Sequence, residues 1–122
     1  MSQRHTVLSG SEYESIVGYS RAVRTGPYIA VAGTTADGDD IAAQAREVLR
    51  RIEIALRQAG GSLADVVRTR MYVTDISLWE QVGAVHAEVF GEIRPVTTMV
   101  EVSALISPDL LVEIEVDAYR ED

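Results

Sequence analysis

Residues 94–119 read RPVTTMVEVSALISPDLLVEIEVDAY, and this stretch predicts two strands of a sheet. Its first half alternates mostly apolar, β-branched residues with more polar ones: Val96, Thr98, Val100 and Val102 against Thr97, Met99, Glu101 and Ser103. Its second half, after a turn at Ser107–Asp109, alternates Leu110, Val112, Ile114, Val116 and Ala118 with Leu111, Glu113, Glu115, Asp117 and Tyr119. Because side chains of a strand alternate between faces, we expect the apolar set of each strand to face the core and the polar set to face away.

The polar face of this sheet carries acidic residues at every second position, Glu113, Glu115 and Asp117. Three such carboxylates could hold a divalent cation, or they could pair with Arg68 and Arg70 of a neighbouring strand. We favour the pairing. Apolar residues interrupt the same face (Met99, Leu111 and Tyr72), and this mixture is typical of a face that packs between subunits.

Two helices are predicted upstream of these strands. Residues 39–61 carry apolar residues at helical spacing, with Asp39 or Asp40 to cap the start and Gly60 to end it. The predicted inward stripe is Ile41, Ala45, Val48, Leu49, Ile52, Leu56 and Ala59. We interpret the arginines of this helix as a solvated face, because glutamates are interleaved with them: Arg46, Arg50, Arg51 and Arg57 with Glu47 and Glu53.

Residues 77–91 predict the second helix, with a Ser77–Glu80 capping box and Gly91 at its end. Its predicted inward stripe is Leu78, Val82, Val85 and Val89. We expect His86 to be a surface or half-buried, hydrogen-bonded histidine rather than a catalyst.

The remaining strands complete an α+β pattern. Residues 5–10 predict a short edge strand, and residues 18–34 predict a hairpin that turns at Gly26–Pro27. In residues 64–75 we expect Val67, Thr69, Met71 and Val73 to face inward, opposite Arg68, Arg70 and Tyr72. The order is (β)ββαβαββ, which predicts one domain over residues 1–122, a mixed sheet with two helices covering one face.

Composition excludes several classes of chemistry. The formal net charge is −8, and the sequence contains no Cys, no Lys and only two His. We therefore expect no disulfide, no Schiff-base lysine, no metal centre, no cofactor and no nucleic acid as the main ligand. With neither an apolar membrane span nor a signal-peptide segment, the chain is expected to be cytoplasmic, without a membrane partner.

Three segments together resemble one family. They are GYSRAVRTGPYIAVAG (18–33), IAAQAREVLRRIEIALRQAGGSLADVVRTRMYVTD (41–75) and the stretch quoted first. They resemble the RidA/YjgF family, often labelled endoribonuclease L-PSP, over about residues 18–120. The resemblance implies a chorismate-mutase-like sandwich that forms a homotrimer with small-molecule clefts between subunits. It also implies hydrolysis of 2-imino acids or enamines to 2-keto acids and ammonia. The face of Thr97, Met99 and Glu101 would then look toward the trimer interior and the cleft edge.

The resemblance also suggests site residues. It places the family's cleft tyrosine on Tyr19 and its water-linked acid on Glu113. The arginine that binds the substrate carboxylate falls on Thr97, which cannot form a bidentate charged pair. The serine before Gly33 falls on Ala32, so a hydroxyl is lost.

Other positions of the resemblance bear on the same cleft. A cleft asparagine falls on Gly83, so an amide is lost, and Met99 lies two residues after Thr97. Either Arg21 or Arg94 could reach into the cleft and replace the missing cation, the alternative for each being a surface arginine. The weaker candidates for the cleft are Thr34 and Thr35. The pattern is that of an Arg-lacking branch of the family. We expect a deaminase-like enzyme of altered specificity or, as alternatives, a non-catalytic small-molecule binder or a protein-interaction trimer. The acidity argues against a ribonuclease.

Overall fold

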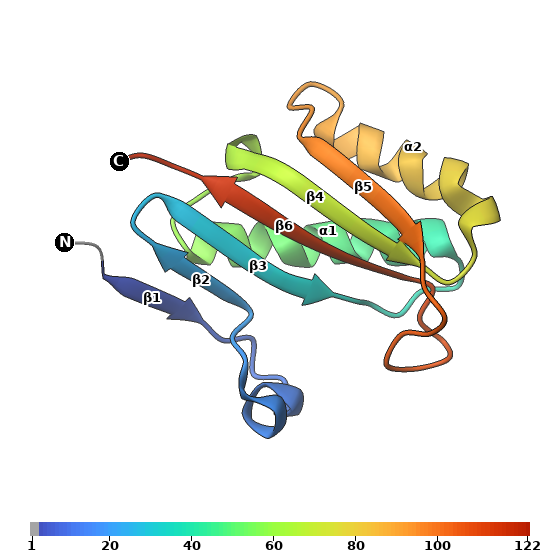
Figure 1. Ribbon diagram of the computed structural model, residues 1–122, viewed down its shortest axis with the longest axis horizontal. Coiled ribbons are helices and arrows are strands. Elements are labelled where there is room, and N and C mark those ends of the chain that lie inside the picture. Colours follow the sequence, from blue (N-terminus) through green and yellow to red (C-terminus); the bar gives the residue numbers. More distant parts are fainter. Residues whose placement is uncertain (1–2) are drawn as a thin grey trace.

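A six-stranded mixed sheet carries the fold, with strand order β1-β2-β3-β6-β4-β5 (Figure 1). The computed structural model describes residues 3–122. Its strands are β1 (Arg4–Val7), β2 (Ala22–Thr25), β3 (Tyr28–Thr34), β4 (Val66–Val73), β5 (Val96–Glu101) and β6 (Val112–Tyr119). Its two main helices are α1 (Ile41–Gln58) and α2 (Trp79–Phe90), and its short helical turns are η1 (Glu14–Gly18), η2 (Leu63–Asp65) and η3 (Ile76–Leu78). Among the strands of residues 3–122, only β4 and β5 pair in parallel, across the α2 connection. The predicted α+β class, edge strand and hairpin are confirmed.

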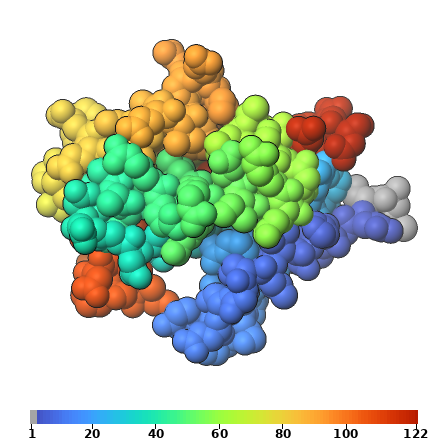
Figure 2. All heavy atoms as spheres, turned by 180° about the vertical axis from the view of Figure 1, so that it is seen from behind, coloured from blue at the N-terminus to red at the C-terminus, as the bar shows by residue number. Residues whose placement is uncertain are grey.

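Both helices cover the same face of the sheet, as the view from behind shows (Figure 2). The Asp40 side chain caps α1 by accepting a hydrogen bond from Ala43 N at 2.8 Å, and Gly60 follows the helix with φ 85°. All seven residues of the predicted inward stripe of α1 are buried. They pack on the helix-facing residues of β6, which are at most 1% exposed: Val112, Ile114, Val116 and Ala118.

The arginines of α1 form surface ion pairs, as predicted. Arg50 and Arg51 both contact Glu47, while Arg57 contacts Glu53. Arg46 reaches across to Glu88 on α2. Exposed pairs of this kind contribute little stability, so this face is solvated rather than a phosphate site.

The start of α2 differs from the prediction. Asp75 accepts hydrogen bonds from Ser77 N at 3.0 Å and from Ser77 Oγ at 2.6 Å. The Ser77 hydroxyl is therefore engaged before the helix begins at Trp79, and the predicted Ser77–Glu80 capping box is wrong. The physical reason is η3, the short helical turn that comes directly before α2. Asp75 caps this turn by accepting from Ser77, so Ser77 does not cap α2.

One face assignment in β4 is also wrong. The register between β4 and β6 shifts between Val66 and Arg68, which inserts Val67 as a bulge. Val67 is consequently 51% exposed, and Val66 takes the buried position instead. The rest of the strand follows the prediction, because Thr69, Met71 and Val73 are buried.

The two faces of β5 are exchanged relative to the prediction. In the parallel register Thr97 lies beside Thr69 and Met99 beside Met71, and both β4 partners are buried under the helices. Thr97 and Met99 therefore face the helix layer rather than the open face. The valines of β5 point to the open face, where Val96 is 60% exposed. The parallel register of β5 against β4 determines which side chains of β5 face the helices. Because β5 is an edge strand, its valines on the open face stay exposed in a single chain.

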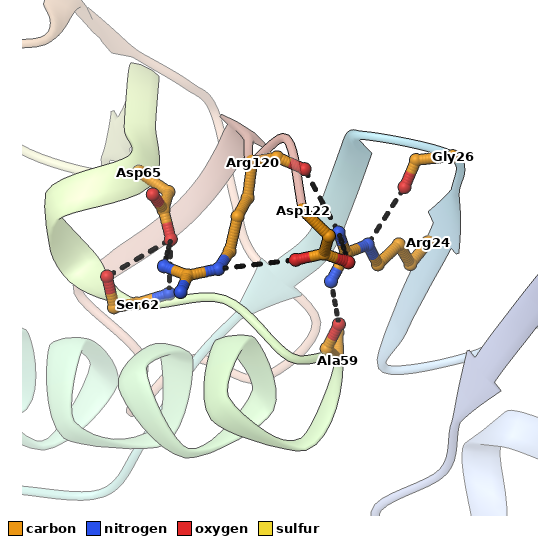
Figure 3. A network of polar contacts seen from close by, with 7 residues as sticks. All are labelled: Arg24, Gly26, Ala59, Ser62, Asp65, Arg120 and Asp122. Atoms are coloured by element: carbon orange, nitrogen blue, oxygen red, sulfur yellow. Dashed lines mark hydrogen bonds and ion pairs between the residues drawn. The ribbon is translucent and has the colours of Figure 1, made fainter.

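A polar network ties the β2–β3 turn to the chain's C-terminal segment (Figure 3). Arg24 donates to Gly26 O, Ala59 O and Arg120 O, and it pairs with Asp122 at 2.9 Å. Arg120 in turn pairs with Asp65 at 3.1 Å. These contacts join β2, the end of α1 and the end of β6, and so they fix the hairpin that leads into the candidate site.

Candidate functional site

A cavity of about 900 Å³ lies between α1 and the N-terminal segment, beside the ends of β3 and β6. Figure 2 shows the hollow between α1 and the blue N-terminal segment. Six residues singled out from the sequence line it: Tyr19, Arg21, Gly33, Thr34, Thr35 and Glu113. The fold thus brings together residues from three separate parts of the chain, and their roles stay predictions.

Glu113 extends from β6 on the face of the sheet that the helices leave open. Its neighbours Val112 and Ile114 are fully buried on the other face, and Glu113 itself is half-buried. Burial raises its pKa, the negative charge of Glu115 raises it further, and the positive charge of Arg21 opposes the rise. A carboxyl group with a raised pKa exchanges protons more readily near neutral pH, as general acid–base chemistry requires.

Gly33 provides the space that the Glu113 carboxylate occupies. The β3–β6 register shifts between Val31 and Thr34, so that Gly33 sits in an irregular part of the strand. A Cβ atom at Gly33 would lie 2.9 Å from Glu113 Cδ, closer than real side-chain contacts allow. The absence of a side chain at position 33 is therefore a steric requirement of the site.

Arg21 is the cation that acts on Glu113 in this cavity, which Arg51 of α1 also lines. Its Nη1 donates to Gly33 O at 3.1 Å and to Thr34 Oγ1 at 2.9 Å, and its Nη2 contacts Tyr19 Oη at 3.4 Å. The guanidinium carbon also lies 5.6 Å from the centre of the Tyr19 ring. Because Nη1 uses both of its protons on the protein and Nη2 donates one to Tyr19, Nε and the second proton of Nη2 are left to meet a ligand. Thr34 is buried and holds Arg21 in place.

Sequence reasoning missed the loop that closes one side of the cavity. Glu14, 7% exposed, accepts hydrogen bonds from Ser9 N, from Ser9 Oγ at 2.6 Å and from Gly10 N at 3.2 Å. These bonds, the Ser9 hydroxyl first, lower the pKa of Glu14. Arg51 of α1, also missed, donates to Thr35 O at 2.9 Å. Neither contact follows from hydrophobic periodicity, since Glu14 belongs to a single π-helical turn.

The other predicted site residues lie elsewhere in the chain. Ala32 adjoins the cavity through the backbone, where its N–H donates to Arg21 O at 2.9 Å. Gly83 lies on α2, and Arg94, with φ 55°, donates from Nε to Gly91 O at 3.1 Å. Thr97 and Met99 belong to β5, which β6 and β4 separate from β3. Within one chain Arg21, not Arg94, is the cation beside Glu113.

A second polar cluster surrounds Thr97. The buried Thr69 hydroxyl lies 2.9 Å from His86 Nε2 and 2.9 Å from Thr97 Oγ1. The His86 ring also stands against Phe90, with centroids 4.8 Å apart, and burial lowers the pKa of His86. His86 is half-buried and hydrogen-bonded, as the sequence predicted.

The acidic residues farther along β6 are paired on the open face. Asp117 contacts Arg70 at 3.3 Å and accepts a hydrogen bond from Tyr28 Oη at 3.0 Å, while Tyr72 Oη donates to Glu115. Of the expected pairing with Arg68 and Arg70, the Arg70 pair is confirmed, whereas within residues 3–122 Arg68 forms no ion pair with these acids. Within residues 3–122 no cluster of three His, Asp or Glu side chains is arranged to hold a metal ion. Over the same residues neither α1 nor α2 combines the length and apolarity needed to cross a membrane.

Comparison with known proteins agrees with this fold. The family described as Endoribonuclease L-PSP matches residues 9–120. A Mycobacterium tuberculosis crystal structure, a member of the YjgF/YER057c/UK114 family, is 74% identical with a TM-score of 0.95, covering 96% of this chain and 99% of that one. A RutC family protein of Pyrococcus horikoshii is 39% identical over 84% of this chain and 87% of its own length.

One relative carries a named activity. The 3-aminoacrylate deaminase RutC of Acinetobacter baylyi is 43% identical over 62% of this chain and 59% of its own length. The fold and these matches define an α+β protein of the YjgF type. The chain belongs to the RidA/YjgF family, which confirms the predicted family and fold.

Proposed function

We propose that the protein is a cytoplasmic homotrimer that hydrolyses a small imine or enamine in clefts between its subunits. The observation that carries the proposal is the half-buried Glu113, with its raised pKa, beside Arg21 in a cavity of about 900 Å³. In this reaction water adds to the carbon of a C=N bond. The C–N bond then breaks to leave a carbonyl group and ammonia, and an enamine first takes a proton on carbon and loses one from nitrogen to become the imine.

Glu113 is the proton carrier in this scheme. Its carboxylate takes a proton from the attacking water and passes it to the nitrogen, then takes the proton of the resulting hydroxyl and passes it to the nitrogen as the C–N bond breaks, so no net proton is consumed by the protein. Gly33 leaves the space for the carboxylate in this position. Arg21 offers Nε and Nη2 to an electron-rich group of the ligand, and the Tyr19 ring, which contacts Arg21, forms part of the cavity wall.

The location of Thr97 supports a cleft made by two copies of the chain. Thr97 pairs with Thr69 on the helix-covered face, whereas Glu113 pairs with Tyr72 on the open face. Strand β4 lies between them. One chain cannot direct both side chains at the same ligand, so a shared cleft requires Thr97 from a second copy.

The open face of the sheet supports the same assembly. It carries large apolar side chains that one chain leaves uncovered: Tyr28, Val96, Val100 and Tyr119, each at least 41% exposed. Burial of such a face against other copies is favourable in proportion to the apolar area removed from water. The named activity of the Acinetobacter relative, an enamine deaminase, supports the reaction class.

Binding without turnover is the second candidate. The small number of charged hydrogen-bond donors left for a ligand favours this candidate. Nη1 of Arg21 is fully engaged with the protein, and Thr97 supplies one neutral hydroxyl. A cleft of this kind would hold a ligand with fewer charged contacts than a bidentate arginine provides.

The deciding assay generates 2-iminopropionate from alanine with an amino-acid oxidase and traps the remaining imine with semicarbazide. We expect the wild type to accelerate loss of the imine and Glu113→Gln to match buffer. Glu115→Gln is the matched control, because Glu115 lies on the same face of β6 and bonds to Tyr72, and it should retain most of the activity. A wild type that matches buffer but is stabilised by small metabolites would favour binding without turnover.

A further inference from the structure

His86, Thr69 and Thr97 form a continuous hydrogen-bonded chain from helix α2 to the exposed edge of the sheet. Thr69 Oγ1 lies 2.9 Å from His86 Nε2 and 2.9 Å from Thr97 Oγ1, and Thr97 Oγ1 lies 3.2 Å from Pro95 O. Thr69 is fully buried, while Thr97 is exposed. The chain therefore connects a titratable ring to a hydroxyl that a ligand can reach.

Counting protons favours one direction of this chain. Each threonine hydroxyl has one proton, and a carbonyl oxygen can only accept, so the contact of Thr97 Oγ1 with Pro95 O makes Thr97 the donor there. In that arrangement Thr97 accepts from Thr69, and Thr69 accepts from His86. The neutral ring then carries its proton on Nε2, and every donor in the chain points outward.

We infer that His86 is a positioning residue that acts through Thr69 to make the Thr97 hydroxyl an outward hydrogen-bond donor. Position 97 then selects a ligand group that only accepts, such as a carboxylate or carbonyl oxygen, which replaces Pro95 O as the partner of Thr97. The opposite tautomer of His86 would reverse the chain and turn Thr97 into an acceptor. The inference rests on the proposed function, because it takes Thr97 as a ligand contact.

Protonation of His86 should strengthen this donor. The doubly protonated ring can only donate, which excludes the reversed chain, and hydrogen bonds that begin at a charged donor are stronger than neutral ones. The charge of the ring then polarises the Thr69 and Thr97 hydroxyls, so that Thr97 donates a stronger hydrogen bond to the ligand at the position where an arginine is missing.

The ionisable groups around His86 are engaged elsewhere. Glu101, on the same face of β5, accepts a hydrogen bond from Ile76 N at 3.1 Å. Glu88 of α2 pairs with Arg46 of α1, and Arg94 donates to Gly91 O. On β4 the residues that face this layer are Thr69 and Met71, neither of which titrates in this range. Across residues 3–122, no charged side chain makes a hydrogen bond to the ring.

The first measurement is the tautomer of His86, read from the ¹⁵N chemical shifts of the ring at pH 8. The signal is assigned by its loss in His86→Gln. We expect the Nε2–H tautomer in the wild type and a change in Thr69→Val, which removes the hydroxyl but keeps the shape. The Nδ1–H tautomer in the wild type would overturn the inference, whether or not the protein has activity.

The second measurement is pyruvate binding, followed by calorimetry from pH 8 to pH 4.5, because burial lowers the pKa of His86 while the pyruvate carboxylate stays ionised over this range. We expect about fivefold tighter binding by the wild type at the lower pH, and a flat profile for His86→Gln, whose amide donates but does not titrate. All proteins carry Glu113→Gln, so that the titration of Glu113 does not contribute. A pH profile for His86→Gln equal to that of the wild type would contradict the assignment.

Variants of the threonines complete the test. Thr97→Val and Thr69→Val should each weaken pyruvate binding about fivefold, while Thr97→Ser and Thr69→Ser keep a hydroxyl and should restore it. Thr98→Val is the matched control, since Thr98 lies on the opposite face of β5 and should not change binding. Unchanged binding in Thr97→Val, or no pyruvate binding at any pH, would overturn the assignment. Imine turnover in the wild type would still support the proposed function in that case.

Discussion

The carboxylate of Glu113 lies directly against the backbone of Gly33, where a Cβ atom would come within 2.9 Å of Glu113 Cδ. The replacement Gly33→Ala should therefore displace the carboxylate or the strand. We expect a loss of imine hydrolysis of at least tenfold with destabilisation below about 1 kcal/mol, because every atom that the Cβ would meet belongs to the movable Glu113 side chain. The measurements are steady-state kinetics and urea unfolding.

Gly83→Ala is the matched glycine replacement for the unfolding measurement. A Cβ at Gly83 would meet only Trp79 Cε3, at 4.0 Å, and the position is inside α2. We expect stabilisation of about 0.5–1 kcal/mol, from the higher helix propensity of alanine. Equal destabilisation by both replacements would contradict the steric role of Gly33.

The raised pKa of Glu113 predicts how stability depends on pH. Burial is the main cause of the rise, so folding favours the protonated form of this group. Its contribution is most favourable below the ordinary carboxyl pKa of 4.5 and is lost as the pH increases through the raised pKa. Glu113→Gln should accordingly melt at a higher temperature than the wild type at pH 8, with the difference shrinking toward pH 4. A difference that grows toward low pH would mean that the pKa is lowered instead.

Replacing Arg21 should shift the pH dependence of the reaction. Its charge lowers the pKa of Glu113, so Arg21→Gln should raise that pKa and move the acidic limb of the pH–rate profile to higher pH. Arg94→Gln should leave the limb in place, because Arg94 donates to Gly91 O at the far edge of the sheet. The opposite pattern would assign the cation of the site to Arg94.

Glu14 should control the order of the loop that borders the cavity. Glu14→Gln replaces a carboxylate that accepts from Ser9 N, Ser9 Oγ and Gly10 N, so the amides of Ser9 and Gly10 should exchange hydrogen faster. Glu12→Gln, two residues earlier on an exposed side chain, is the control and should leave both amides unchanged. Equal protection in Glu14→Gln and wild type would show that other contacts hold the loop.

Helix α1 and strand β6 were predictable because one periodic pattern decides each of them. The inward stripe of α1 and the alternation of β6 both match the buried residues. The cavity gathers Tyr19, Arg21 and Glu113, whose roles stay predictions. In those elements the local pattern and the tertiary packing agree.

Strand β5 was not predictable in the same way. Its valines suggested the core face, yet the parallel register with β4 turns Thr97 and Met99 toward the helices. The bulge at Val67 and the cap formed by Asp75 depend on register and turn geometry, which hydrophobic alternation does not encode. Contacts between distant segments, such as that of Arg51 with Thr35, leave no local signal at all.

The most direct test of the shared cleft is complementation between two inactive variants. Glu113→Gln removes the proton carrier, and Thr97→Trp fills the opposite side of the proposed cleft from an exposed position. If each cleft takes Glu113 from one subunit and position 97 from the next, trimers reassembled from an equal mixture should recover about a quarter of wild-type turnover. Light scattering of the mixture should report a trimer. Activity no greater than that of the separate variants, in a mixture shown to exchange subunits, would contradict a site built from two chains.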